Sequence, residues 1–254
     1  MADSSTDQNN ETEPGFQKLK EHIFLHKIDF ALWVTRVFSI FFTIGYFIPL
    51  FWNPYSLYYK TLMSNASTSA LRLHQRLPQV SFTKQFLQQL LLEDSCHYLF
   101  YSIIFLYIAP ITLALQPILL FSILHSASYS LTLLDCLGQN SWWGARFLIS
   151  LVEFQSRNLL KLISFTEIFL MPFSVILLLL GYANLFTPVF YYQFLCLRYS
   201  SRRNPYTRNL FHELRMLLEK TAYKPGMPQF VRQALLTVVS VACKLAPNVH
   251  VQEN

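Results

Sequence analysis

Long stretches without Asp, Glu, Lys or Arg alternate with short charged segments along this chain. A helix of about 20 apolar residues spans the hydrocarbon core of a bilayer. The runs at 31–52 and 160–181 have this length and therefore each predict one crossing. The first of these runs contains Arg36, and the second contains Lys161 and Glu167. The run at 95–134 has no formal charge at all, and it is about twice as long as a single crossing requires.

The long central run contains two prolines that divide it. As one helix it would measure roughly 60 Å at 1.5 Å per residue. Pro110 and Pro117 lie near its middle, and proline disfavours a continuing helix. We therefore expect a central helical hairpin with crossings at about 96–115 and 117–134, and with both ends on one side of the membrane.

The segment after the last long run leaves two topologies open. Gly181, Asn184 and Pro188 interrupt the helical pattern, so that 185–197 either returns across the bilayer or lies in the interface. A return would place the N-terminus in the lumen, whereas an interfacial segment would place it in the cytosol. The distribution of Lys and Arg slightly favours the return.

The two ends of the chain differ in character. Residues 1–26 read as a disordered polar tail, 27–197 as a multi-pass membrane domain, and 198–254 as a basic cytosolic tail. The tail carries two amphipathic helical patterns, which we expect to lie in the membrane interface. Their candidate membrane-inserting residues are Phe211, Leu214, Leu217, Leu218, Phe230, Leu235 and Val238.

Arginines cluster at the start of the basic tail. Basic residues next to a crossing are retained on the cytosolic side, so the cluster is explained by topology alone. A more specific hypothesis is contact with anionic lipid or an acidic protein partner, since each basic residue near an anionic leaflet contributes about 1 kcal/mol. The candidates are Arg198, Arg202, Arg203, Arg208 and Arg215.

Composition supports an all-α, polytopic membrane protein. The 254 residues are 53% hydrophobic and 13% charged, whereas about a quarter of a soluble domain is charged. The net charge of +6 belongs mainly to residues beside apolar runs, so orientation in a membrane explains it better than nucleic-acid binding. The four scattered cysteines predict neither a disulfide framework nor a zinc site.

The sequence offers little catalytic chemistry. It contains no nucleotide-binding, hydrolase or metalloprotease motif, and we assign no catalytic, cofactor-binding or metal residues. Glu167 lies inside a predicted crossing, where an acid is a functional hypothesis by default. A link to another helix is the favoured role. The alternative is a small intramembrane transporter or channel-modulating protein that uses Glu167 and two histidines of the hairpin, His97 and His125.

Four segments resemble the transmembrane protein 33 family, also called Krüppel homologue 2, which includes yeast pore-membrane proteins of the nuclear envelope. They are TSALRLHQRLP (68–78), LLEDSCHYLFYSIIF (91–105), EIFLMP (167–172) and YYQFLCLRYSSRRNPYTRNLFHELR (191–215). The resemblance implies a non-enzymatic, multi-pass protein of the endoplasmic reticulum and nuclear envelope, with a lumenal N-tail and a cytosolic basic tail. It also implies roles in reticulum tubule shape, nuclear-pore distribution and stress signalling, with reticulon-type proteins and nuclear pore components as partners.

Overall fold

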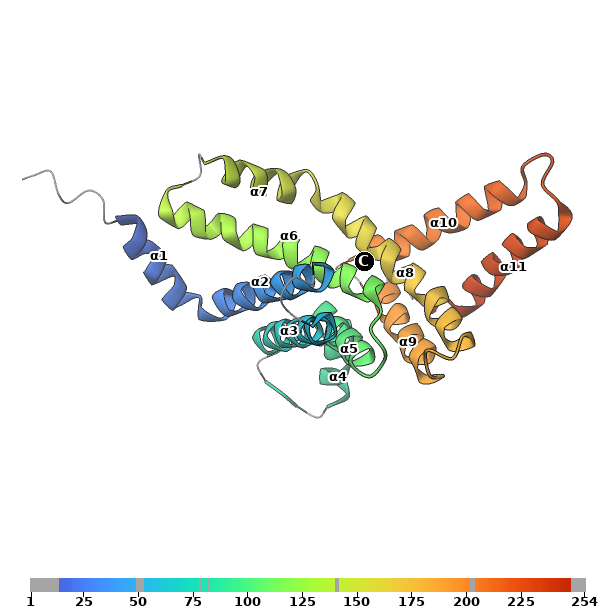
Figure 1. The fold of residues 1–254 in the computed structure, drawn as a ribbon, viewed down its shortest axis with the longest axis horizontal. Helices are drawn as coiled ribbons and strands as arrows, with labels where there is room; N and C mark the ends of the chain where they lie inside the picture. The colour runs from blue at the N-terminus through green and yellow to red at the C-terminus, as the bar shows by residue number, and fades with distance from the viewer. Residues whose placement is uncertain are drawn as a thin grey trace, which may run out of the picture.

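The structure is a computed structural model that describes residues 14–48, 53–77, 79–81, 83–139, 142–201 and 204–247. Within these ranges every regular element is a helix (Figure 1). This confirms the predicted all-α class. The helices are α1 (Pro14–Leu25), α2 (Lys27–Phe47), α3 (Pro54–Arg76), α4 (Lys84–Leu92), α5 (Asp94–Leu106), α6 (Thr112–Leu137), α7 (Trp143–Glu153), α8 (Ser156–Leu179), α9 (Phe186–Ser200), α10 (Tyr206–Ala222) and α11 (Gln229–Leu245).

Three of the described helices are long and apolar enough to cross a membrane, namely α2, α6 and α8. Helix α2 covers the start of the run expected at 31–52, whose last four residues lie outside the described ranges. Helix α8 contains most of the run expected at 160–181. The segment expected at 185–197 forms α9, which has 15 residues.

The central run turns at a different place from the one expected. Helix α5 ends at Leu106 and α6 begins at Thr112, so the turn contains Pro110, whereas Pro117 lies inside α6. Pro117, the sixth residue of α6, removes one backbone hydrogen bond, and membrane helices tolerate such an interruption when neighbouring helices pack around it. The 13 residues of α5 give a length of only about 20 Å. The two arms are therefore unequal, and α5 packs against α3 and α9 while α6 packs against α2, α7 and α8.

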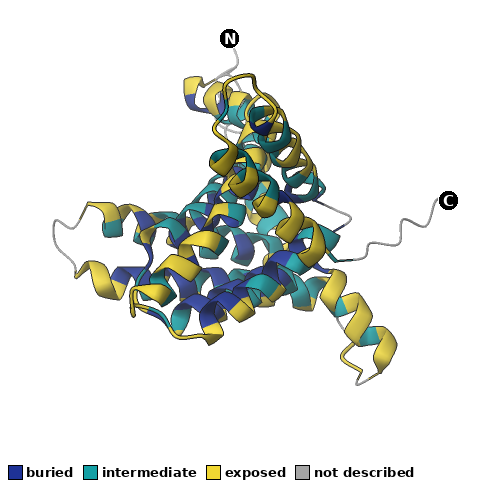
Figure 2. Ribbon diagram, turned by 90° about the vertical axis from the view of Figure 1, so that its right-hand side faces the viewer, coloured by how far each residue is buried: buried dark blue, intermediate teal, exposed yellow. Residues whose placement is uncertain are grey.

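Aromatic side chains build the core where α3, α5, α6 and α9 meet. Tyr101 and Phe194 lie with their ring centroids 5.0 Å apart, and the Tyr101 hydroxyl donates to the Ala114 carbonyl at 2.8 Å. Figure 2 shows buried residues concentrated in this bundle, whereas the projecting helices are largely exposed. Fully buried tyrosines of α3 and α9 complete the cluster, namely Tyr58 and Tyr191.

Helices α2 and α3 pack through small polar residues. The Ser64 hydroxyl donates to the Thr35 carbonyl at 2.7 Å, and the Thr68 hydroxyl donates to the Thr35 hydroxyl at 2.9 Å. On its other side α3 contacts α5, where the Asn65 amide donates to Ser102 at 2.8 Å. Small and hydroxyl-bearing residues allow helices in a membrane to approach closely and to bond across the interface. The polar character of α3 is therefore satisfied inside the bundle.

Two helices lie where the sequence predicted none. Residues 14–25 of the expected disordered tail form α1, which packs against α6. The expectation of disorder is therefore wrong for these residues, because docking on α6 stabilises them; residues 1–13 lie outside the described ranges. The second unexpected helix is α7, which follows α6 and exposes Trp143 and Phe147.

The basic tail forms the two amphipathic helices that the sequence predicts. Helices α10 and α11 pack against each other and project from the bundle as an antiparallel pair (Figure 1). Helix α10 also packs on α8 and α9. The Tyr192 hydroxyl of α9 donates to the Leu245 carbonyl at 2.8 Å, which holds the end of α11 against the bundle.

Candidate functional site

A buried ion pair joins the middle of α8 to the last turn of α9. The Arg198 Nε atom lies 3.1 Å from both carboxylate oxygens of Glu167, and both side chains are fully buried. The Arg198 Nη1 atom donates to Asp94 Oδ1 at 3.2 Å, at the start of α5. We call these three residues the ion cluster. It connects α8 and α9, which follow one another in the sequence, to α5, which lies far before them.

Hydroxyl groups complete the surroundings of the two carboxylates. The Tyr98 hydroxyl donates to Glu167 Oε1, and the Thr207 hydroxyl donates to Glu167 Oε2 at 3.2 Å. The Ser201 hydroxyl donates to Asp94 at 2.7 Å. Burying a charge is costly unless it is paired and hydrogen-bonded, and these contacts offset that cost. They also bring the first turn of α10 to the cluster.

Helix ends favour this arrangement of charges. Asp94 lies in the first turn of α5 and Arg198 in the last turn of α9. An anion at a helix N-terminus and a cation at a helix C-terminus both interact favourably with the helix dipole. The Arg198 guanidinium also lies 5.3 Å from the centre of the Tyr98 ring, a geometry that adds a cation–π attraction.

The position of Arg198 corrects one of the sequence-based expectations. Its side chain has no exposed area, so it cannot contact lipid or a partner in this structure. The helix that carries it, α9, folds back onto α8, which carries Glu167. Arg198 is therefore a structural arginine and does not belong to the surface cluster.

The other arginines of the proposed contact differ in exposure. Arg215 is exposed and pairs with Glu219 at 2.8 Å, and Arg208 is half-buried in the first turn of α10. Arg202 and Arg203 lie outside the described residues. Their contact with lipid or with a partner stays a prediction.

The predicted membrane-inserting face is divided between packing and exposure. Phe211 packs edge-on against Tyr199 at 5.7 Å. Like Phe211, Leu214, Leu218 and Leu235 are half-buried. Three members of the face remain exposed, Leu217, Phe230 and Val238. The α10–α11 pair thus keeps an apolar surface after both helices have packed.

The groups that suggested transport make contacts inside the bundle, and the Nδ1 atom of His97 lies 3.7 Å from Asp94 Oδ1 of the ion cluster. Glu167 is paired as described above, and His97 is buried with its Nε2 atom 2.7 Å from the Leu91 carbonyl oxygen. The ring of His125 stacks on Phe121 at 5.9 Å, on α6. Among the described residues, no three His, Cys, Asp or Glu side chains are grouped to hold a metal ion.

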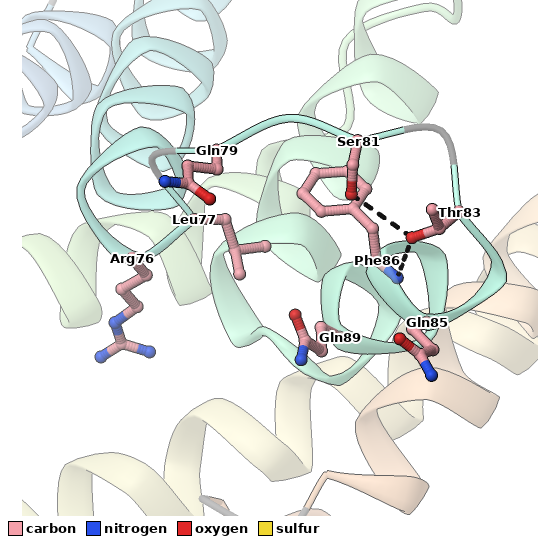
Figure 3. Close-up of a pocket in the computed structure, with 8 residues that line it drawn as sticks. All are labelled: Arg76, Leu77, Gln79, Ser81, Thr83, Gln85, Phe86 and Gln89. Carbon is pink, nitrogen blue, oxygen red and sulfur yellow. Dashed lines mark hydrogen bonds between the residues drawn. The ribbon is translucent and has the colours of Figure 1, made fainter.

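A polar hollow of about 370 Å³ lies beside the connection from α3 to α4 (Figure 3). Thr83 caps α4 by accepting a hydrogen bond from the Phe86 amide at 3.2 Å, and Ser81 bonds to Thr83. The lining consists of Arg76, Leu77, Gln79, Ser81, Thr83, Gln85, Phe86 and Gln89. Among these lining residues there is no carboxylate, imidazole or thiol that could activate the Ser81 or Thr83 hydroxyl as a general base.

Sequence reasoning recognised Glu167 as unusual but missed its partner. The two members of the pair are 31 positions apart, and the basic residue nearest in sequence, Lys161, pairs instead with Glu213 of α10 at 3.6 Å. The available signal was the absence of any other acid between Glu167 and Arg198. A lone acid and the first base after it, at two ends of an apolar helical hairpin, are candidates for pairing.

Comparison with known proteins agrees with this description of a helical membrane protein. Krueppel homolog 2 of Drosophila melanogaster is 51% identical over 232 residues, covering 91% of this chain and 84% of the relative. Transmembrane protein 33 of Homo sapiens is 46% identical over 226 residues, with coverages of 88% and 92%. The Transmembrane protein 33 homolog of Caenorhabditis elegans is 34% identical over 240 residues, with coverages of 92% and 87%.

No solved structure matches the chain. The sequence model of Transmembrane protein 33/Nucleoporin POM33 matches residues 11–248, which is nearly the whole of it. The match includes the α8–α9 hairpin that carries Glu167 and Arg198 as well as both helices of the basic tail. The chain is therefore a membrane protein that belongs to the Transmembrane protein 33/Nucleoporin POM33 family.

Proposed function

We propose that this chain is a non-enzymatic protein of the endoplasmic reticulum and nuclear envelope that shapes or organises reticulum membrane. The family name, with its nucleoporin member, supports a place in the nuclear envelope. Reticulon-type proteins, other membrane proteins of these compartments and nuclear pore components are the proposed partners. Tubule structure, nuclear pore distribution and modulation of the stress response are the proposed outputs.

The observation that carries this proposal is the exposed apolar surface of the α10–α11 pair. Leu217, Phe230 and Val238 are each more than half exposed, on helices that also carry Arg and Lys residues. Burying one such side chain gains up to about 1.5–3 kcal/mol. Basic residues add attraction to an anionic leaflet. The pair therefore has the composition of a membrane-surface element.

The physical route to curvature is an area difference between leaflets. Helices that insert their apolar side to a depth of about 5–10 Å occupy area in one leaflet only. Because the ion cluster and the packing of α10 on α8 hold the pair against the bundle, this insertion occurs beside the crossing helices. Expansion of the cytosolic leaflet at that point would favour a curved membrane.

Reconstitution of the full-length protein into vesicles of reticulum-like composition tests the proposal. Electron microscopy should show tubules with the wild type, and fewer with the variant Leu217→Gln/Phe230→Gln/Val238→Gln. The matched control alters three exposed apolar residues outside the tail, Phe16, Val80 and Leu87. Equal tubulation by the tail variant and the wild type would contradict the proposed role of the tail.

The transporter alternative is tested with the same vesicles. Glu167 is neutralised by Arg198 and accepts hydrogen bonds from Tyr98 and Thr207, which favours a structural role. We therefore expect no ion flux above that of empty vesicles. Flux that appears with the wild type and disappears with Glu167→Gln would support transport and overturn the non-enzymatic, non-transporting proposal.

A further inference from the structure

Six helices form three consecutive antiparallel pairs whose turns gather at one end of the bundle. The pairs are α2–α3, α5–α6 and α8–α9, and their connections follow Phe47, Leu106 and Leu179; residues 49–52 of the first connection lie outside the described ranges. The Tyr46 hydroxyl at the end of α2 lies 2.7 Å from that of Thr112, the first residue of α6. The Tyr59 hydroxyl of α3 donates to the Ile108 carbonyl of the second turn at 3.3 Å.

The third pair joins the same end. An apolar hollow of about 640 Å³ is lined by residues from the end of α2, the second turn, the start of α6 and the second half of α8. The ring of Phe190, near the start of α9, contacts Phe100 of α5 at 6.2 Å between centroids. The end of α2, the turn after α5 and the second half of α8 therefore lie on one side of the bundle.

The opposite end is held together by ion pairs. Asp29 at the start of α2 lies 3.6 Å from Arg72 near the end of α3. Arg76, the last residue of α3, pairs with Glu93 just before α5 at 2.6 Å. The ion cluster then joins the start of α5 to the end of α9. The starts of α2 and α5 and the ends of α3 and α9 thus lie together at one charged end of the bundle.

Formal charge is divided unequally between the two ends. In these six helices, Lys60 is the one Asp, Glu, Lys or Arg in the half next to the turns. None of the three turns contains a formally charged residue. Lys60 is exposed and lies in the second turn of α3, from where a lysine can extend its ammonium group to a nearby interface.

We propose that all six helices cross the membrane as three hairpins, so that the N-terminal tail and the basic tail share the cytosolic side and only the turns reach the lumen. Retention of basic residues in the cytosol orients the charged end. The segment from Leu162 to Leu179 in α8 measures about 27 Å, which is the thickness of the hydrocarbon core in the reticulum. It places the turns at the lumenal interface.

This arrangement explains why only three helices have the apolar composition of crossings. Helix α3 bonds three of its polar residues, Ser64, Asn65 and Thr68, to α2 and α5, which lowers the cost of a position in the membrane. Helices α5 and α9 are short because they begin or end at the ion cluster, which stabilises charge below the cytosolic surface. The arrangement replaces the lumenal N-tail implied by the family resemblance, and it holds whether or not the chain shapes membranes.

Cysteine accessibility in sealed microsomes tests the arrangement. In a background without Cys96, Cys136, Cys196 and Cys243, single cysteines are introduced as Ser5→Cys, Gln139→Cys, Tyr182→Cys and Lys224→Cys. They report on the N-tail, the α6–α7 connection, the α8–α9 turn and the basic tail. A membrane-impermeant maleimide is added before or after detergent permeabilisation.

The three-hairpin arrangement predicts labelling at positions 5, 139 and 224 without permeabilisation, and at 182 only after it. Three crossings by α2, α6 and α8 with a cytosolic basic tail predict protection at 5 and 139 and labelling at 182 and 224, and that result would overturn the proposal. The native chain with an N-terminal epitope is a second test that needs no cysteine replacement. Protease should remove the epitope from sealed microsomes, whereas its protection, or glycosylation at Asn10, would overturn the proposal.

Discussion

Replacement of Arg198 by Met should destabilise the membrane domain more than any other single arginine replacement in the described structure. Met retains most of the apolar length of the side chain but removes the charge. Glu167 then remains fully buried without a cation, since Arg198 is its sole ion-pair partner among the described residues. Asp94 also loses its contact with Arg198, although it is partly exposed and retains the hydroxyl of Ser201.

The expected magnitude follows from the fate of the remaining carboxylate. Removing one partner of a buried ion pair costs about 3–5 kcal/mol, because the other charge stays buried and uncompensated. At about 2–4 °C per kcal/mol for a domain of this size, the melting temperature should fall by roughly 10 °C. Glu167→Gln should cost less, about 1.5–3 kcal/mol, because Arg198 keeps Asp94 as a partner.

The assay is thermal unfolding of the purified full-length protein in lipid nanodiscs. The double variant Arg198→Met/Glu167→Met should be more stable than Arg198→Met alone, because no uncompensated charge remains at the Glu167 position. The control is Arg215→Met, at an exposed position where changes stay within about 0.5 kcal/mol. In the contrary outcome, the stability lost by the double variant equals the sum of the losses measured for Arg198→Met and Glu167→Met. That result would refute the reasoning, since it would show that the two side chains do not interact.

Three further outcomes are expected. Changing Arg202, Arg203 and Arg208 of the tail to Gln should weaken binding to anionic vesicles, measured by co-sedimentation. The loss should be up to about a hundredfold, at about 1 kcal/mol for each arginine. The same change at Lys18, Lys20 and Lys84 should leave binding unchanged. Asn65→Leu should cost about 1 kcal/mol, measured as melting temperature, because the amide loses its 2.8 Å bond to Ser102; an unchanged value would contradict that role. Thr83→Ala should remove about 1 kcal/mol of protection from hydrogen exchange in α4, whereas Ser81→Ala should leave α4 protected, and equal effects would contradict the assignment of Thr83 as the cap.

Sequence patterns predicted where the helices of this protein lie better than which helices pack against each other. The apolar runs located α2, α6 and α8, and amphipathic periodicity located α10 and α11. Both signals are local, because each depends on residues within a few turns of one helix. The disordered tail was misjudged at residues 14–25 because the stability of α1 comes from contact with α6. A polar segment gives no local sign of that contact.

The candidate site depended on contacts between distant residues. Arg198 looked like a surface residue because three arginines follow it within ten positions, yet it is buried and pairs with Glu167. Two residues on the helices of a hairpin can pair when they are equally far from the turn. Glu167 lies 12 residues before the end of α8, and Arg198 lies the same distance beyond the start of α9. This equal distance from the turn could have identified the pair, but only once the first and last residues of the turn were known.

The ion cluster has a mechanical consequence for the tail. Ser201, just after α9, donates to Asp94, and Thr207 in the first turn of α10 donates to Glu167. The root of the tail is therefore bonded to the same carboxylate that joins α8 to α9. A membrane force on Leu217 or Phe230 acts on a helix pair that is fixed to the crossings at this point. A rigid attachment transmits tilt whereas a free linker dissipates it. Under the proposed insertion of the tail, the buried pair would therefore couple the tail to the orientation of the bundle.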